Sequence, residues 1–243
     1  MTQQFIHLKE TDSTNSWLQS YARQNDPNEG LLVFTDFQTS GRGQMGNHWE
    51  SAPGANLLFT LLLKPANLPA NAQFVLSQAV ALGVVDYLST FGADFSIKWP
   101  NDIYWNNKKI AGILIENDLD GNHVGRSYIG IGLNINQLEF VSDAPNPVSL
   151  AQIIGRQLPL GDCLDGVYQA ILDRYARLSQ ADRIRCDYKD KLYRFGQPAR
   201  YRDANGLFTG TIEGVADSGH LLVRHPDGTL HHYFFKEIEF VIG

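Results

Sequence analysis

Residues 95–116 read FSIKWPNDIYWNNKKIAGILIE, and the expected sheet can be built outward from this stretch. Three short apolar β segments are predicted within it, over 95–99, 103–105 and 109–116. Asn106 and Asn107 form a hairpin turn pair that joins the second segment to the third. Pro100 fixes a turn directly after the first segment, so the stretch predicts strands connected by tight turns.

Helical and strand patterns alternate on both sides of this stretch. Broad apolar spacing over 72–88 predicts a helix laid across the sheet, and the spacing over 164–178 is the cleanest helical signal. An amphipathic helix entered through a polar cap is expected after Asp12. Further strands are predicted over 31–35, 56–63 and 128–136. The fold class is therefore α+β, with a mixed β-sheet flanked by helices.

The pattern changes near residue 191 to short strands separated by glycine turns. Strands are predicted over 199–202, 208–215, 220–224 and 231–235. Asn205-Gly206, Ser218-Gly219 and Asp227-Gly228 separate them at the spacing of a small β-barrel. We therefore expect two domains, 1–188 and 189–243.

Composition limits the kinds of partner. The 243 residues include 20 basic and 26 acidic side chains, a net charge of −6 that argues against general nucleic-acid binding. The longest apolar run, 57–63, is far shorter than the roughly 20 residues that span a bilayer, and no signal peptide is evident. Cys163 and Cys186 lie outside any metal or redox spacing. A cytoplasmic protein without a membrane or nucleic-acid partner is expected.

A glycine-rich segment, Gly41-Arg42-Gly43-Gln44-Met45-Gly46, is followed by Trp49. Glycines let backbone amides approach an anion, and Arg42 adds a permanent charge suited to phosphate. The segment matches neither the dinucleotide fingerprint nor the Lys-terminated phosphate loop. On the residues alone, a plain turn is the alternative.

Polar residues follow the first strand in Lys98-Trp99-Pro100-Asn101-Asp102, where Asn101 and Asp102 can converge on a ligand. Lys109 begins the strand beyond the hairpin and can face a phosphate or developing negative charge. The alternative for Lys109 is a solvated lysine at a sheet edge.

Glycine alternates with apolar residues in Gly130-Ile131-Gly132-Leu133-Asn134. A glycine weakens a strand by about 0.5–1 kcal/mol relative to alanine, so close approach of another group is expected there. Both a ligand and a tight sheet crossing account for the pattern.

These motifs, in this order and after Asp12-Ser13-Thr14-Asn15, resemble those of the biotin protein ligases, which join biotin to a lysine of biotin-dependent carboxylases. The resemblance covers residues 11–154 and continues into the tail, which is similar to the family's small SH3-like domain. It implies the fold shared by biotin ligases and class II aminoacyl-tRNA synthetases. Only 11 residues precede Asp12, as in short forms without an N-terminal DNA-binding domain.

The resemblance assigns residues to the biotin side of the site. Ser13, Thr14 and Asn15 match positions that hydrogen-bond the neutral ureido ring, with helix capping as their alternative role. Arg42 and Lys109 match residues that contact the biotin carboxylate and the α-phosphate. The remaining matches on this side are Gln38, Gly43, Gln44, Gly112, Gly130 and Gly132.

A second group is assigned to the nucleotide. Asn134 matches an adenine contact, and Trp49 would wall the pocket or belong to the core. Asp102 matches a position that coordinates Mg²⁺ or orients the incoming amine, and residues 137–147 would form the adenine-side loop. The nucleotide-side matches together are Arg42, Gly43, Gly46, Trp49, Asn101 and Asn134.

One departure concerns the glycine loop. The family commonly has arginine after the second loop glycine, whereas this chain has Gln44 and Met45. A neutral amide makes a weaker bond to phosphate than a guanidinium does. The loop is therefore expected to retain the acyl-adenylate less tightly.

The resemblance implies two half-reactions without a covalent enzyme intermediate. Biotin attacks the α-phosphate of Mg·ATP to give biotinyl-5'-AMP and pyrophosphate, and an acceptor lysine then attacks this adenylate. Arg42, Lys109 and Asp102 are the expected catalytic residues. ATP, biotin and Mg²⁺ are expected as substrates and metal, and the biotin carboxyl carrier protein of acetyl-CoA carboxylase or a related carboxylase as acceptor.

Two alternatives stay open from the sequence. One is a lipoate or octanoate ligase of the same fold, and the other is a non-enzymatic regulator that binds partners through the β-barrel. The oligomeric state also stays open, with a homodimer as one option. The tail histidines are expected to be surface residues rather than metal ligands, because His231 and His232 point to opposite faces of a strand.

Overall fold

The computed structural model describes residues 4–141 and 146–242. Contacts divide the chain into two compact units, each built from two separate parts of the sequence. The first unit comprises Met1–Gln73 and Lys108–Gln169, and the second comprises Phe74–Asn107 and Ala170–Gly243. The division into domains 1–188 and 189–243 stays a prediction.

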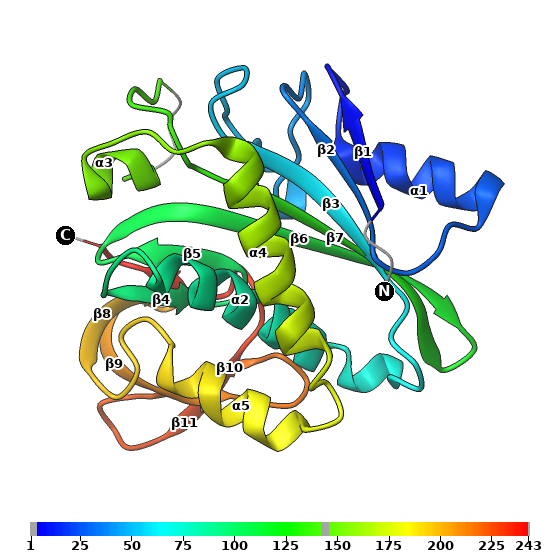
Figure 1. Cartoon of the computed structure of the whole chain (residues 1–243). Helices are drawn as coiled ribbons and strands as arrows, with labels where there is room; N and C mark the ends of the chain where they lie inside the picture. Colours follow the sequence, from blue (N-terminus) through cyan, green and yellow to red (C-terminus); the bar gives the residue numbers. More distant parts are fainter. Residues whose placement is uncertain (1–3, 142–145, 243) are drawn as a thin grey trace. The chain divides into compact units, whose positions relative to one another are not determined.

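The first unit contains a mixed sheet (Figure 1). Its elements are β1 (Gln4–Leu8), α1 (Thr14–Asn25), β2 (Leu31–Thr35), β3 (Leu57–Leu63), β6 (Lys108–Asp120), β7 (His123–Leu133), α3 (Leu150–Ile154) and the start of α4 (Leu160–Tyr175). Within this unit the strands follow the order β1-β2-β3-β7-β6. Only β1 and β2 pair in parallel, and each later pair is antiparallel, which confirms the expected mixed sheet.

Helices of the first unit cover both faces of this sheet. On one face, Leu18 of α1 packs into a buried cluster with Val33 and Leu62, against which Ile6 also lies. On the other face, the Tyr168 ring of α4 contacts the ring of Phe5 at a centroid distance of 5.2 Å. Neighbouring side chains in a strand point to opposite faces, so α1 and α4 lie on opposite sides of β1.

The second unit is built around an apolar helix. Its elements are α2 (Phe74–Ser89), β4 (Phe95–Lys98), β5 (Asp102–Trp105), the end of α4, α5 (Ala181–Asp190), β8 (Pro198–Asp203), β9 (Gly206–Val215), β10 (Leu221–Arg224), β11 (Leu230–Tyr233) and β12 (Glu239–Phe240). A Cβ on Gly83 of α2 would lie 2.6 Å from the Ile171 Cα, so this glycine lets α2 approach α4 closely. The helical stretch Ala70–Ser89 has the length and hydropathy of a membrane span, but 67% of its apolar window is buried, as in a core helix.

A five-stranded antiparallel sheet follows in the same unit, in the order β11-β10-β9-β8-β12. Gly206, Gly219 and Gly228 have φ angles of 115°, 89° and 87°, a region that favours glycine. The predicted turns are therefore confirmed, and so is the expected β-rich C-terminal part.

Four short elements have no counterpart in the pattern analysis: β1, α3, α5 and β12. The strand β1, QFIHL, has only five residues and no regular alternation of apolar and polar residues, and β12 has two residues. Helix α5 buries only Ile184 and Tyr188 among ten residues, so its apolar stripe is narrow. Such elements are held by tertiary contacts and give weak periodic signals.

Candidate active site

The first turn of α1 brings three predicted biotin-side residues into the interior of the first unit. Ser13, Thr14 and Asn15 are all buried. Ser13 is the N-cap residue, but its side chain makes no capping hydrogen bond, so the capping role considered for it is wrong. Instead, its backbone N–H donates to Asp12 Oδ1 at 2.7 Å.

Gln38 is attached directly to this helix start. Its Oε1 accepts hydrogen bonds from the Thr14 backbone N–H at 2.8 Å and from Thr14 Oγ1 at 3.1 Å. Gln38 therefore lies beside Thr14, and their common assignment to biotin stays a prediction. The contact also uses the amide oxygen of Gln38, which leaves its NH₂ group as the donor for other partners.

A buried hydroxyl fixes Asn15. Thr60 of β3 donates to Asn15 Oδ1 at 2.6 Å, and Asn15 Nδ2 donates to the Leu114 carbonyl at 3.3 Å and to Glu116 Oε2 at 3.0 Å. Thr60, Gly130 and Leu114 form one row across β3, β7 and β6. A Cβ on Gly130 would lie 2.9 Å from Asn15 Cγ, so the expected close approach at Gly130 is made by a side chain of the protein itself.

The pattern analysis did not single out Thr60, although a signal existed. It is the one hydroxyl-bearing residue in the otherwise apolar strand LLFTLLL, and it is fully buried. A buried hydroxyl needs a hydrogen-bond partner. Its position therefore pointed to a polar group on the neighbouring element.

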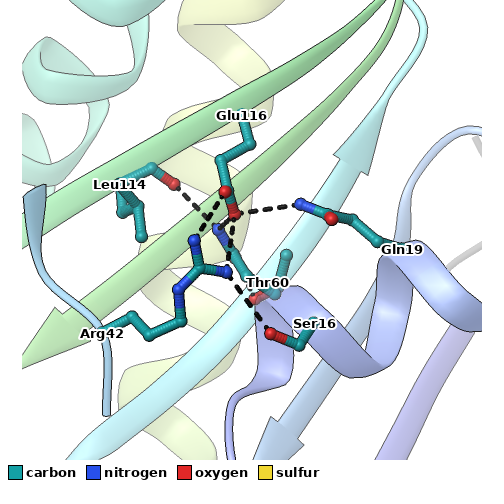
Figure 2. A network of polar contacts seen from close by, with 7 residues as sticks. Ser16, Gln19, Arg42, Thr60, Leu114 and Glu116 are labelled. Atoms are coloured by element: carbon teal, nitrogen blue, oxygen red, sulfur yellow. Dashed lines mark hydrogen bonds and ion pairs between the residues drawn. The ribbon is translucent and has the colours of Figure 1, made fainter. Parts of the chain in front are cut away.

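Arg42 lies in a polar network with Glu116 (Figure 2). Its Nη2 donates to Glu116 Oε1 at 2.8 Å, and its Nη1 donates to Glu116 Oε2 at 3.4 Å and to Ser16 Oγ at 3.3 Å. Gln19 Nε2 also donates to Glu116 Oε2, at 2.9 Å. Glu116 was not singled out from the sequence, where it is only the last residue of a predicted strand.

Trp49 covers the next row of the same sheet face. Gly112 and Gly132 are register partners on β6 and β7, and a Cβ on either would lie within contact of the indole. The distances to Trp49 would be 2.9 Å from Gly112 to Cζ3 and 2.8 Å from Gly132 to Cδ2. The two bare positions therefore form a platform for the Trp49 ring.

Lys109 joins this cluster at the start of β6. Its Nζ lies 5.6 Å from the centroid of the Trp49 ring, within the range of a cation–π contact. Its backbone N–H donates to the Asn146 carbonyl at 2.9 Å, and its carbonyl accepts from Val148 N–H at 2.9 Å. A neighbouring chain segment therefore runs beside the backbone of Lys109, which does not lie at an open sheet edge, and the residue is half-buried.

Three predicted site residues carry buried polar atoms that have no hydrogen-bond partner among the described residues. They are Gln44 Oε1, Trp49 Nε1 and Asn134 Oδ1. The Asn134 amide nitrogen is satisfied by the Val148 carbonyl at 3.1 Å, which leaves the oxygen available. An unsatisfied buried polar group costs about 1–3 kcal/mol, so such atoms in one compact unit are suited to a polar ligand.

Asn101 and Asp102 belong to the second unit. Lys98 and Asp102 face each other across the β4–β5 pair, with 4.0 Å between Lys98 Nζ and Asp102 Oδ2. Among residues 4–141 and 146–242, no group of three or more His, Cys, Asp or Glu side chains could hold a metal ion.

The adenine-side loop expected over 137–147 is only partly described. Gln137 Oε1 accepts from Asn56 Nδ2 at 2.6 Å and from the Ala52 backbone N–H at 2.9 Å. Residues 142–145 lie outside the described residues. The described part of this loop is thus attached to the start of β3 through Asn56.

Comparisons with known proteins show which family this chain belongs to. The Biotin/lipoate A/B protein ligase family matches residues 8–134. The biotin–(acetyl-CoA carboxylase) ligase of Paracoccus denitrificans is 32% identical over 234 residues, 91% of this chain and 94% of that protein. The bifunctional ligase/repressor BirA of Bacillus spizizenii is 32% identical over 236 residues, 94% of this chain and 71% of that protein.

A solved structure of the biotin protein ligase from Aquifex aeolicus, in complex with biotin and ATP, superposes with a TM-score of 0.80. It is 26% identical to this chain, and the match covers 99% of both chains. The chain belongs to the biotin/lipoate A/B protein ligase family. The Paracoccus and Aquifex proteins, which match nearly the whole length of this chain, are biotin protein ligases, which confirms the resemblance drawn from the motifs.

Proposed function

We propose that this chain is an ATP-dependent biotin protein ligase that works through biotinyl-5'-AMP. One observation carries the proposal: four separate sequence motifs meet on one face of the first unit's sheet. Asn15 lies over Gly130, and Trp49 lies over the next row at Gly112 and Gly132. The Paracoccus and Aquifex relatives, which match along nearly the whole chain, carry the same activity in their names.

In the first half-reaction, Arg42 and Lys109 offset the negative charge that builds where the biotin carboxylate meets the α-phosphate. Both side chains carry a positive charge at neutral pH, and both contact residues that lie on or over this face of the sheet. Lys109 is positioned by the Trp49 ring, and Arg42 by Glu116. The Trp49 and Asn134 atoms that lack a hydrogen-bond partner within residues 4–141 and 146–242 are suited to bind the polar groups of the adenylate.

Mg²⁺ enters this scheme as part of the substrate Mg·ATP. Among the described residues, Asp102 belongs to no group of three or more His, Cys, Asp or Glu side chains that could hold a metal ion, and its Oδ2 lies 4.0 Å from Lys98 Nζ. A site with so few protein ligands fits an ion that keeps phosphate oxygens and water as most of its ligands. It does not fit a resident metal centre made of protein side chains alone.

In the second half-reaction, the ε-amine of an acceptor lysine attacks the adenylate and displaces AMP. The amine must lose a proton before or during attack, and we assign Asp102 the role of orienting it or accepting that proton. We propose a biotin carboxyl carrier protein as acceptor, in agreement with the substrate named for the Paracoccus ligase. We also propose a cytoplasmic location and the absence of DNA binding, whereas the oligomeric state stays open, with a homodimer as one option.

The decisive experiment is mass spectrometry of a purified carrier domain after incubation with this protein, ATP, Mg²⁺ and biotin. The expected result is a mass increase of one biotin on one lysine. Parallel reactions with lipoate and octanoate in place of biotin test the other branch of the family. Transfer of either acid, with no transfer of biotin, would contradict the proposal.

A further inference from the structure

The Glu116 carboxylate occupies a site that is built for an anion. It accepts hydrogen bonds from Arg42, Asn15 and Gln19, and no other carboxylate takes part in this network among the described residues (Figure 2). Convergent charged and amide donors of this kind are the usual partners of carboxylates and phosphates. The protein therefore supplies its own alkyl carboxylate to the arginine that the proposed function assigns to the substrate.

The Arg42–Glu116 pair is built so that the arginine can leave. The Arg42 side chain is 45% exposed and the Glu116 side chain 29% exposed, so the pair is only partly shielded from water. Without Arg42, the carboxylate keeps Asn15 Nδ2 at 3.0 Å and Gln19 Nε2 at 2.9 Å. Its loss of one partner does not leave a bare buried charge.

Arg42 has fewer alternative partners than Glu116. Apart from Glu116, its side-chain partner among the described residues is the Ser16 hydroxyl at 3.3 Å, which carries no charge. Its backbone is held by a bridge to His48 and flanked by Gly41 and Gly43. The guanidinium can therefore change partners by side-chain rotation, provided that a second anion takes the place of Glu116.

We infer that Glu116 is an internal competitor that a substrate carboxylate must displace from Arg42. Glu116 is thus a positioning residue that acts through Arg42 and sets the apparent affinity for anionic biotin. The exchange gives no advantage to a ligand that lacks a negative charge at this point. The inference rests on the proposed function, because it takes biotin as the acid that reaches Arg42.

The test compares biotin with its neutral alcohol analogue, in which CH₂OH replaces the carboxylate. Calorimetry should show that Glu116→Gln, which keeps the shape and an amide oxygen as acceptor, binds biotin about two- to five-fold more tightly than wild type. This range corresponds to about 0.4–1 kcal/mol, the value of a partly exposed ion pair. Binding of the alcohol should not change.

A matched control is available in the second unit. Arg224 and Glu213 form an ion pair with side-chain exposures of 44% and 37%. Glu213→Gln therefore removes the same kind of interaction at a similar exposure, and biotin affinity should stay at the wild-type value. In the Arg42→Met background, Glu116→Gln should also have no effect, because the competition acts through Arg42.

Unchanged or weaker biotin binding by a folded Glu116→Gln variant would overturn the inference, and so would an equal change for biotin and the alcohol. A measurement on wild-type protein covers the case in which the variant does not fold. In NMR spectra of the wild-type protein, the side-chain carboxyl carbon resonance of Glu116 should shift on addition of biotin but not of the alcohol. An equal shift with both compounds would refute the competition. If wild-type protein binds neither compound, the proposed function fails together with the inference, whereas failure of the variant alone leaves the function standing.

Discussion

Two arginine–glutamate pairs of similar exposure show how the two units use the same chemistry differently. Arg42 sits on a glycine loop and contacts Glu116, whose carboxylate also accepts from two amides. Arg224 and Glu213 lie on the paired strands β10 and β9, and Arg224 also donates to the Gly228 carbonyl at 2.8 Å. In the Arg224–Glu213 pair, both residues lie on paired strands. In the Arg42–Glu116 pair, only Glu116 lies on a strand, and Arg42 lies on a loop.

The hydrogen bonding at and around the two arginine–glutamate pairs also differs. Hydrogen bonding from Arg224 lowers the pKa of Glu213, and the same bond raises the pKa of Arg224. Around the loop pair, Gln44 and Trp49 keep buried polar atoms without a partner among the described residues. Changes in the first unit should therefore act mainly on binding, and changes in the C-terminal sheet mainly on stability.

The largest effect is expected from Lys109→Ala. This change removes the ammonium beside Trp49, where charge develops on the α-phosphate in the proposed reaction. Loss of one preorganised electrostatic contact of this kind lowers a rate by about 10²–10³-fold. ATP–pyrophosphate exchange in the presence of biotin measures this step directly.

Lys108 provides the control, since it is the preceding lysine on the same strand and is exposed. Lys108→Ala should leave the exchange rate close to that of wild type. A normal rate in Lys109→Ala would refute the role assigned to Lys109. Equal losses in both variants would point to damage of the strand instead.

The next largest effect is expected from Gly132→Ala. The added Cβ would enter the Trp49 ring, with 2.8 Å to Cδ2, so the indole must move. Overpacking of this kind costs about 1–3 kcal/mol of unfolding free energy, and biotin binding should weaken as well. Urea unfolding, followed by tryptophan fluorescence, reports both the stability and the displacement of the ring.

Gly161 of α4 is the matched position in the same unit, because a Cβ there would meet nothing within 4 Å. Gly161→Ala should be neutral or stabilising, by up to about 1 kcal/mol, as expected for alanine in a helix. If Gly132→Ala were as stable as wild type and bound biotin equally well, the platform assigned to Gly112 and Gly132 would be wrong.

The elements with strong periodic patterns could be predicted from the sequence. The strand over 31–35 agrees with β2 at both ends, and the hairpin at Asn106-Asn107 lies between β5 and β6. The mixed sheet and the β-rich tail were also expected. These features depend on local periodicity and turn chemistry, which a single sequence contains.

The contents of the site depend on contacts that are distant in sequence. The glycines at 130 and 132 predicted a close approach, but not that Asn15 and Trp49 make it. Glu116 follows an apolar run and gives no sign that Arg42, 74 residues earlier, pairs with it. Such pairings arise only when β6, β7 and the glycine loop are assembled, so they could not be read from local patterns.

A smaller effect is expected from Gln44→Arg, which restores a charge in the glycine loop. Gln44 Oε1 is buried and accepts no hydrogen bond from the described residues, so the end of the side chain is enclosed by protein but lacks a partner there. A charged donor bonds phosphate about twice as strongly as a neutral one, so biotinyl-5'-AMP should dissociate several-fold more slowly. A stopped-flow chase of the preformed adenylate measures this rate, and an unchanged rate would show that residue 44 does not control retention.

The smallest effect is expected in the C-terminal sheet, at His225. Its ring stacks on Phe208 and His231 at centroid distances of 4.2 and 4.0 Å, and its Nε2 lies 2.6 Å from Tyr233 Oη. Burial, and then the neighbouring His231, lowers the pKa of His225 below its usual 6.5. The folded state therefore favours the neutral ring.

The sign of the pH dependence follows from that direction. A group whose pKa is lower in the folded state than in the unfolded state binds fewer protons when folded, so stability falls as the pH drops below about 6.5. Urea unfolding at about pH 8 and about pH 5.5 should show this loss, and His225→Phe should reduce it while keeping the stacked ring. His232→Gln, at an exposed position on the same strand β11 as His231, should keep the wild-type dependence. The C-terminal sheet carries no residue assigned to biotin. ATP–pyrophosphate exchange at neutral pH should therefore be the same in both histidine variants. A loss of exchange in His225→Phe alone would show that the sheet does more than support the fold.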